Sequence, residues 1–342
     1  MKHTLRTIPA LLCAAAALAA PLAAKAQSNV SLYGLLDMSV GQFQTAGTAK
    51  VKKVDSGNMS TSFIGFQGKE DLGDSLGAIW KLEGFVRVDS GASGRFTGDT
   101  FFSRNAYVGL QGKFGTVTVG RNTTPLFVST LIFNALGDSF GFSPSIRQLF
   151  TPSTGLAFFG DTGWNNSVFY GSPNWSGLSF TLLGNLSEGG AGATGTNMSG
   201  NALYFAGPIA ATAAYQKVRN SAFGTPAGFR SQDTWQLGAS YDLKMAKFYG
   251  QYSRAKTDAT VDTETKLYSV GVSVPMGQGK ALLQYGHANA DFGATEVTNK
   301  TLTVAYDYNL SKSTDIYAVL MNDKLTAKAT GNTYAAGVRL RF

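Results

Sequence analysis

The carboxy-terminal segment, residues 331–342, alternates between apolar and polar side chains. One alternate set is Tyr334, Ala336, Val338, Leu340 and Phe342, and the other is Ala335, Gly337, Arg339 and Arg341. Because a strand points successive side chains to opposite faces, this segment has one apolar face and one charged face. The pattern is typical of a transmembrane barrel strand, with lipid outside and water inside. A half-buried strand of a soluble sandwich has the same pattern, so recurrence and export must decide between them.

The amino-terminal segment has the three parts of a secretory signal. Lys2, His3 and Arg6 give a basic start, and an unbroken apolar run follows from Leu11 to Ala20. Residues 24–26, Ala-Lys-Ala, then match the small-x-small cleavage pattern. The apolar run is short for a membrane span, which disfavours a retained anchor. We therefore predict that residues 1–26 are a cleaved signal peptide and that the mature chain begins at Gln27.

Charge and cysteine content exclude several classes of function. Cys13 is the only cysteine and lies in the expected signal, so the mature chain has no disulfide and no cysteine metal site. Removal of the signal lowers the basic count from 29 to 26 against 21 acids, a net charge of +5. That charge is too small to imply nucleic acid, and no basic run is interleaved with aromatics. We expect no nucleic-acid partner, no metal and no cofactor.

Alternation with a period of two recurs throughout the mature chain, whereas no apolar stretch after residue 26 is long enough for a transmembrane helix. Only a closed barrel would satisfy such a backbone in a membrane. We predict an all-β, antiparallel, 16-stranded transmembrane barrel. Its strands are expected near 30–41, 59–69, 76–87, 101–112, 114–121, 164–172, 177–187, 200–206, 209–218, 232–242, 245–254, 265–274, 280–288, 298–309, 314–322 and 332–342.

The connections between these strands alternate between short turns and long polar loops, for example 41–58 and 88–100, as in outer-membrane barrels. One connection, 122–163, is much longer and is rich in phenylalanine. A segment of that length without secondary structure is usually functional or disordered, and this one is too apolar for a solvated linker. We expect it to fold inward and to bury its phenylalanines against the inner wall.

Six blocks of sequence, in order, resemble the general porins of Gram-negative outer membranes, most closely their beta-proteobacterial branch. They are Ser31-Leu32-Tyr33-Gly34-Leu35-Leu36-Asp37, Ile64-Gly65-Phe66-Gln67-Gly68-Lys69-Glu70-Asp71-Leu72-Gly73, Arg104-Asn105-Ala106-Tyr107-Val108-Gly109-Leu110, Phe114-Gly115-Thr116-Val117-Thr118-Val119-Gly120-Arg121, Asn166-Ser167-Val168-Phe169-Tyr170-Gly171-Ser172-Pro173 and Gly337-Val338-Arg339-Leu340-Arg341-Phe342. The resemblance implies a homotrimer of 16-stranded barrels whose third long loop narrows each pore, with passive diffusion of small hydrophilic solutes and ions.

The resemblance also implies where the constriction lies. In the family, basic residues on the wall face acidic residues and carbonyls on the inward loop, and Arg104 matches such a wall position. The remaining candidates are Lys81, Glu83 and Arg87 on the lumen-facing parity of the preceding strand, and Asp138 and Arg147 on the loop. Arg121 resembles the family residue at the root of the loop, with a structural or interface role as an alternative to pore lining. A charge facing lipid at mid-depth costs roughly 2–4 kcal/mol, so the wall charges are expected to face water.

Two departures from the family pattern modify this expectation. Phe63 stands where the family often has arginine. The family also often has arginine just before Asn166-Ser167, where this chain has Gly163 and Trp164. The basic cluster is therefore expected to be thinner, with a larger apolar contribution. Opposed charges across a narrow constriction bias ion choice by their net excess. We expect a mild preference for anions.

The terminal Phe342, with apolar residues at alternate positions, resembles the signal read by the outer-membrane barrel assembly machinery. The resemblance further implies contact with outer-membrane lipid and lipopolysaccharide, and location in the cell outer membrane. Alternatives remain open: a selective channel for anionic or aromatic acids, or a structural or adhesive barrel with a blocked lumen. An enzyme is not expected. His287 is the only histidine of the mature chain, and no nucleophile-elbow motif is present, so a surface lipase or protease would have to depend on that residue.

Overall fold

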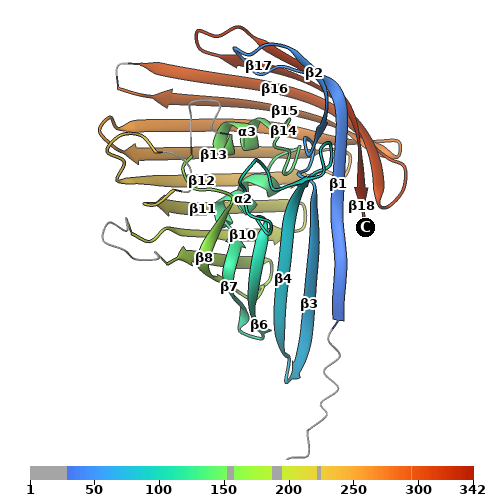
Figure 1. Cartoon of the computed structure of the whole chain (residues 1–342), viewed down its shortest axis with the longest axis vertical. Helices are drawn as coiled ribbons and strands as arrows, with labels where there is room; N and C mark the ends of the chain where they lie inside the picture. Colours follow the sequence, from blue (N-terminus) through green and yellow to red (C-terminus); the bar gives the residue numbers. More distant parts are fainter. Residues whose placement is uncertain (1–28, 152–157, 187–194, 222–224, 294) are drawn as a thin grey trace, which may run out of the picture.

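A computed structural model describes residues 29–151, 158–186, 195–221, 225–293 and 295–342. Antiparallel strands wind around a closed barrel, and two short helices are drawn inside the ring (Figure 1). The blue and cyan strands of one wall cross the yellow to red strands of the other in this view, because barrel strands tilt relative to the barrel axis. The expected signal peptide, residues 1–26, lies outside the described residues.

The chain order of the elements alternates between strands and turns, except where the two helices interrupt it. The elements are β1 (Asn29–Phe43), β2 (Val51–Ser56), β3 (Phe63–Gly73), β4 (Leu76–Arg87), β5 (Ala92–Ser93), β6 (Asn105–Gly112), β7 (Gly115–Thr123), α2 (Pro125–Ile132), α3 (Pro144–Phe150), β8 (Gly163–Gly171), β9 (Leu178–Asn185), β10 (Met198–Ala206), β11 (Ile209–Val218), β12 (Ser231–Asp242), β13 (Lys247–Asp258), β14 (Thr263–Met276), β15 (Gly279–Asp291), β16 (Glu296–Asn309), β17 (Thr314–Leu325) and β18 (Gly331–Arg341).

The 18 strand segments of the described chain occupy sixteen positions around the barrel. β2 and β3 share one position, because β2 pairs with residues 38–43 of β1 and β3 with residues 29–35. β5 is a two-residue strand that pairs with the end of β4, whereas β6 pairs with the body of β4. β18 returns to pair with β1 and closes the ring. The predicted 16-stranded antiparallel barrel is confirmed.

The sequence predicted a loop over 41–58 followed by one strand over 59–69. The structure instead has β2 within that loop and begins β3 only at Phe63. The Asp37 carboxylate of β1 accepts hydrogen bonds from the backbone N–H groups of Met59 and Ser60, at 2.6 and 2.8 Å. Buried backbone donors need partners, and this carboxylate supplies them in place of the β1 ladder. The chain therefore leaves the wall between the two strands and rejoins it at Phe63.

The alternation of side chains in β18 follows the expected parity. Tyr334, Val338 and Leu340 are 50, 43 and 42% exposed on the outer face, whereas Ala335 and Arg339 are each 8% exposed on the inner face. A barrel whose outer face meets lipid places its apolar side chains there without a second sheet to cover them. The same alternation holds along the long strands β11 to β17.

The carboxy-terminus completes the closure of the barrel. The backbone groups of Phe342 and Gly34 exchange hydrogen bonds, with Gly34 N–H donating at 3.0 Å and Phe342 N–H donating at 3.2 Å. The Phe342 ring lies over Gly34, so that a Cβ atom at residue 34 would stand 2.7 Å from the ring. Glycine at this position makes room for the terminal ring, because any side chain would displace it.

The long connection after β7 contains the two helices, which the sequence did not indicate. α2 follows Thr124 and begins with Pro125, whose missing N–H is harmless at the first helical position. α3 is capped by Ser143, whose hydroxyl accepts from the Ile146 N–H at 3.5 Å. Among the described residues, no helix has the length and apolar character needed to cross a membrane.

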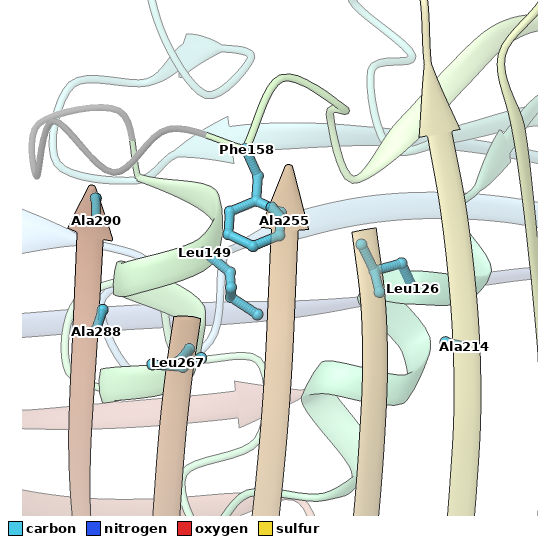
Figure 2. Close-up of a cluster of buried hydrophobic side chains, with 8 residues drawn as sticks. All are labelled: Leu126, Leu149, Phe158, Ala214, Ala255, Leu267, Ala288 and Ala290. Carbon is cyan, nitrogen blue, oxygen red and sulfur yellow. The ribbon is translucent and has the colours of Figure 1, made fainter. Parts of the chain in front are cut away.

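The inner face of the wall holds the helical segment through small apolar contacts (Figure 2). Leu126 of α2, Leu149 of α3 and Phe158 pack against one buried cluster. The wall residues of this cluster are Ala214, Ala255, Leu267, Ala288 and Ala290, from β11, β13, β14 and β15. Because most of these wall side chains are single methyl groups, the helices approach the sheet closely.

Glycine on the same wall allows a second close approach. A Cβ atom at Gly286 of β15 would lie 2.5 Å from Gln148 Oε1 and 2.6 Å from Pro144 Cβ, both of the α3 segment. Gln148 is buried and donates to the Asn299 side-chain oxygen of β16 at 2.7 Å. Packing and hydrogen bonds thus fix α3 against β14 to β16, as α2 is fixed against β10 to β12.

Candidate functional site

A cavity of about 370 Å³ separates the inward segment from the wall around β4. Arg87, Arg104, Asp138 and Arg147, four of the six residues expected to form a constriction, line it. Arg95 also lines it, from the loop between β5 and β6. Four arginines and one aspartate therefore line the same space.

Arg104 is held by a buried carboxylate and by an aromatic ring. Its Nη1 atom lies 2.6 Å from Glu83 Oε2, and its guanidinium stands over the Phe63 ring at 4.2 Å from the centroid. Such a stack is attractive because the ring face carries negative charge. Phe63, which we expected to thin the basic cluster, thus contributes to the position of Arg104.

Glu83 lies behind the cavity rather than in it. Its side chain is 1% exposed and accepts hydrogen bonds from the Tyr33 hydroxyl and the Asn105 amide, each at 2.6 Å. Lys81 Nζ lies 3.9 Å from Glu83 Oε1 and 5.8 Å from the Tyr33 ring centroid. Neither Lys81 nor Glu83 is among the described lining residues of the cavity. Four of the six expected residues therefore line the space; of the other two, Glu83 holds Arg104 from behind and Lys81 contacts Glu83.

Arg95 was not foreseen from the sequence, because a loop residue has no strand parity to place it. Its guanidinium is bound by Asp99 and Asp161, with shortest nitrogen–oxygen distances of 2.9 and 2.6 Å. Burial opposes the charge, but the hydrogen bonds to both carboxylates outweigh it and raise the pKa of Arg95. Burial likewise opposes ionisation of Asp99, and the side-chain and backbone hydrogen bonds from Arg95 outweigh it and lower the Asp99 pKa. The spacing of four residues was the only sequence signal for this pair.

Arg121 joins this group from the root of the inward segment. Its Nη2 atom lies 3.2 Å from Asp161 Oδ2, and its Nε donates to the Ser103 carbonyl at 2.6 Å. Its Nη1 donates to Asn165 at 2.8 Å. These contacts join β7 to the loop before β6, to β8 and to the chain just before β8. Arg121 is not among the described lining residues of the cavity.

Asp138 is positioned by a chain of hydrogen bonds from the closing strand. Arg339 Nη1 donates to Ser60 Oγ at 3.1 Å, and Ser60 Oγ donates to Asp138 Oδ1 at 3.0 Å. Arg339 is itself held by Asp307 and Asp315, each at 2.7 Å. The carboxylate on the inward segment is thereby tied to β18 through residue 60, which the sequence placed in an ordinary strand.

Arg147 occupies the boundary between two cavities. Its Nη1 donates to the Gly141 carbonyl at 3.1 Å, and its Nη2 lies 3.6 Å from Asp323 Oδ2. Burial lowers the pKa of this guanidinium, with Asp323 opposing the shift, but arginine remains charged. Asn58, Gly141 and Arg147 also line a second cavity of about 400 Å³ beside the β1–β2 loop.

Arg87 differs from the other three lining arginines. Within the described parts of the chain, no carboxylate lies at ion-pair distance from it, and its buried Nε has no hydrogen-bond partner. The other three arginines each have an acidic partner that lies outside the described cavity lining. The charge that the cavity presents is therefore positive, although the acids behind it reduce the excess.

The apolar part of the cavity comes mainly from the inward segment. Phe127, Leu131 and Phe140 line it opposite Phe85 of β4. Phe127 contacts Phe140 and Phe150 with centroid distances of 5.9 and 5.2 Å. The segment's aromatic residues are thus divided between the wall and the cavity, whereas the sequence led us to expect all of them against the wall.

The remaining candidates lie elsewhere in the fold. Trp164, at one of the two departures from the family, is buried in a cluster with Leu183 and Val218, and Gly163 begins β8 beside the Arg121 guanidinium. Phe342 is half exposed at the barrel seam. His287 lies on the outer parity of β15, and the described residues contain no group of three side chains suited to a metal ion.

Comparisons with known proteins agree with this architecture. The family described as "Gram-negative porin" matches residues 13–328. Outer membrane porin protein 32 of Delftia acidovorans is 32% identical over 341 residues, covering 96% of this chain and 93% of that protein. The solved structure of an anion-selective porin from Comamonas acidovorans has a TM-score of 0.76 at 27% identity, covering 92% of this chain and 100% of that one.

A more distant structure shares the fold alone. The trimer form of OmpT from Vibrio cholerae has a TM-score of 0.69 at 16% identity, covering 92% of this chain and 99% of that chain. The family match extends over most of the sequence, and the barrel shares its fold with the solved anion-selective porin. The chain belongs to the Gram-negative porin family and is a channel-forming, non-enzymatic β-barrel of the outer membrane.

Proposed function

We propose that the cavity between β4 and the inward segment is the constriction of a water-filled diffusion channel with a mild preference for small anions. The observation that carries the proposal is the lining of four arginines and one aspartate, with Arg87 unpaired among the described residues. Fixed charges in a narrow passage bias which ions enter it. The preference is mild because acidic partners stand directly behind three of the four arginines.

A planar-bilayer measurement tests this function. Purified, folded protein is expected to conduct in steps, and the zero-current potential in a KCl gradient is expected to favour chloride. A potential that favours potassium would contradict the proposed constriction while leaving the channel intact. The absence of conductance from correctly folded protein would instead support a barrel with a blocked lumen.

A second candidate is selective passage of aromatic carboxylates, which the mixed lining favours. Phe127 and Phe140 line the same cavity as the arginines. The ring of an aromatic carboxylate could therefore pack against the phenylalanines while its carboxylate binds an arginine. Liposome flux of benzoate should then saturate, whereas flux of acetate should rise linearly with concentration. Linear flux of both would exclude this selectivity. F127A/F140A should abolish the saturation and leave acetate flux at least as fast.

We further propose that the functional unit is a homotrimer and that residues 1–26 are removed on export. Support for the trimer comes from the trimer form of OmpT, which shares the fold, and support for the removal comes from the basic start, the apolar run and the Ala-Lys-Ala site of residues 1–26. Three equal conductance steps per insertion event and the intact mass of the exported chain test these two points separately.

The proposed assembly role of Phe342 agrees with its place at the seam, where the assembly machinery would have to deliver β18 to β1. Contact with outer-membrane lipid and lipopolysaccharide is proposed for the outer face of the barrel. An F342A variant that still reached the membrane in wild-type amounts would contradict the assembly role.

A further inference from the structure

A second cavity, of about 400 Å³, lies between the β1–β2 hairpin and the inward segment, at the end of the barrel that carries the long loops. Its lining comes from the hairpin and the connection after it, from Gly141 and Arg147 of the inward segment, and from Met321 and Thr333 of β17 and β18. Arg147 also lines the cavity that we propose as the constriction. A solute in the second cavity would therefore lie next to the narrow part of the channel, in a space large enough for a small organic molecule.

Positive and negative charges balance at this second cavity. Lys53 Nζ lies 2.9 Å from Asp55 Oδ2, and both residues line the cavity. In a second pair, Arg147 Nη2 lies 3.6 Å from Asp323 Oδ2, and the arginine is the member that lines the cavity among the described residues. The proposed constriction differs, because Arg87 has no acidic partner there within the described chain. A solute with a single charge gains little from a balanced site, whereas a solute that carries both charges can pair with each.

Asn58 separates the Asp55 carboxylate from the Arg147 guanidinium. Its side-chain amide donates to Asp55 Oδ2 at 2.9 Å, and its carbonyl accepts from the Gly141 N–H at 2.9 Å. The Gly141 carbonyl in turn accepts from Arg147 Nη1 at 3.1 Å. A Cβ atom at Gly141 would lie 2.7 Å from Asn58 Cβ, so this close contact requires glycine. The carboxylate and the guanidinium are therefore held at separate, fixed positions along the cavity.

The Asp55 carboxylate is accessible to a ligand. The Lys53 and Asp55 side chains are 43 and 24% exposed, and an exposed ion pair of this kind contributes little to stability. Lys53 Nζ also lies 5.3 Å from the centroid of the Phe43 ring. The lysine therefore keeps a second partner when a ligand ammonium group replaces it at Asp55.

Apolar residues stand on the same face of the hairpin as these charges. Phe43 and Val51 are register partners on β1 and β2, and Lys53 and Asp55 follow Val51 at alternate positions. Because alternate residues of a strand point to one face, the apolar pair and both charges are directed to the same side. Met321 adds apolar lining from β17. An ammonium, a carboxylate and an aliphatic group on one ligand would match this lining.

We propose that this second cavity binds small zwitterionic solutes, namely α-amino acids with an aliphatic side chain, before they reach the constriction. The α-ammonium group pairs with Asp55, and the α-carboxylate pairs with Arg147 and Lys53. The aliphatic side chain packs against Phe43 and Met321. The inference rests on the channel-forming activity of the family and is independent of the proposed anion preference, because it concerns a different cavity and a solute without net charge.

Leucine and two singly charged analogues test the proposal with the folded, full-length mature protein in a planar bilayer. 4-Methylpentanoate lacks the α-ammonium group, and 3-methylbutylamine lacks the α-carboxylate, whereas all three share the branched chain. Each is added in increasing concentration at neutral pH, and the reduction of single-channel current is recorded. Leucine should reduce the current saturably. Either analogue should bind about tenfold more weakly or less tightly still, since a hydrogen bond to a charged group contributes roughly that factor.

Replacing Asp55 by asparagine should weaken leucine binding about tenfold and leave the weak response to 4-methylpentanoate undiminished. The matched control is Asp89→Asn, an exposed carboxylate in the loop after β4 that is not among the described lining residues, and it should bind leucine as the wild type does. If Asp55→Asn does not fold, Ala49→Trp takes its place. Ala49 is an exposed hairpin residue that lines the cavity, so the indole should fill the space and abolish saturation.

Three results would overturn the proposal. Equal affinity for leucine and 4-methylpentanoate would indicate a simple anion site, and wild-type leucine affinity of Asp55→Asn would remove the carboxylate from the site. A leucine response that stays linear with concentration would show that no site is occupied. The zero-current potential in a KCl gradient, read on the same channels without leucine, tests the proposed anion preference separately. A potential that favours potassium together with saturable leucine binding would contradict only the constriction.

Discussion

Replacing Arg87 by glutamine should reduce the anion preference of the channel without disturbing the fold. Arg87 lines the cavity and has no carboxylate partner among the described residues, so its loss leaves no buried acid unpaired. The other lining arginines lack this property; Arg104→Gln, for example, would leave Glu83 buried and only weakly compensated by Lys81. Arg87 therefore offers a nearly pure change of one charge.

The size of the effect follows from the size of the cavity. A sphere of 370 Å³ has a radius of about 4.5 Å, and two unit charges at that distance interact by about 1 kcal/mol in water. Removal of the charge disfavours chloride and favours potassium, and screening at about 0.1 M salt reduces both effects by roughly a third. A net change of about 1 kcal/mol corresponds to about a fivefold fall in the chloride-to-potassium permeability ratio.

The zero-current potential under a KCl gradient gives this ratio for each variant. Asp138→Asn is the matched opposite change, since it removes the lining carboxylate, and should raise the ratio by a similar factor. Lys244→Gln, in the short turn between β12 and β13, controls for net charge and should change nothing. Shifts of the same sign for the Arg87 and Asp138 variants, or no shift for either, would refute the assignment of this cavity as the constriction.

Three further predictions concern the frame that holds the cavity. Gly34→Ala should lower the temperature at which folded protein survives in SDS, because the new Cβ would meet the terminal ring and a wall carbonyl at 2.7 Å; Gly250→Ala, with nothing within 4 Å, should not. Gln148→Leu should loosen α3, at a cost of roughly 1–3 kcal/mol for the wall groups left unpaired, and appear as increased open-channel current noise with unchanged barrel stability. Because folding lowers the Asp99 pKa, its pairing with Arg95 adds stability above the unfolded pKa of about 3.9 and loses it as pH falls through the folded value. Wild-type heat resistance should therefore converge with that of Asp99→Asn only in strong acid; convergence near neutral pH would contradict the pairing.

Much of the wall could be predicted from the sequence, because a membrane barrel imposes a strict local rule. Lipid on one side and water on the other require alternation at every strand, so Leu340 and Arg339 reveal their faces from sequence alone. The same rule placed Lys81, Glu83 and Arg87 on the inner face. It gave the strand number and the connection 122–163 as the exceptional segment.

The local sequence pattern did not predict the structure where contacts between distant residues replace the hydrogen bonds between neighbouring strands. The Asp37 carboxylate accepts hydrogen bonds from the N–H groups of residues 59 and 60, so β3 begins only at Phe63, and β2 forms inside the expected loop 41–58. The helices of the inward segment form because Pro125 and Ser143 start them and because small wall residues such as Ala288 admit them. Pro125 and Ser143 are local signals, but Asp37 and the wall alanines lie far along the chain from the segments that they contact.

The sequence by itself determined the class of protein, the course of the wall and the faces of its charged residues, because these depend on neighbouring residues and on the solvent at each face. Only the tertiary structure decided which charges meet. It placed Arg104 against Glu83 and Phe63 and brought Arg95, a loop residue, to the cavity. It left Arg87 unpaired among the described residues. The physical reason is that ion pairing depends on distances of a few ångströms between segments far apart in the chain, which no local periodicity encodes.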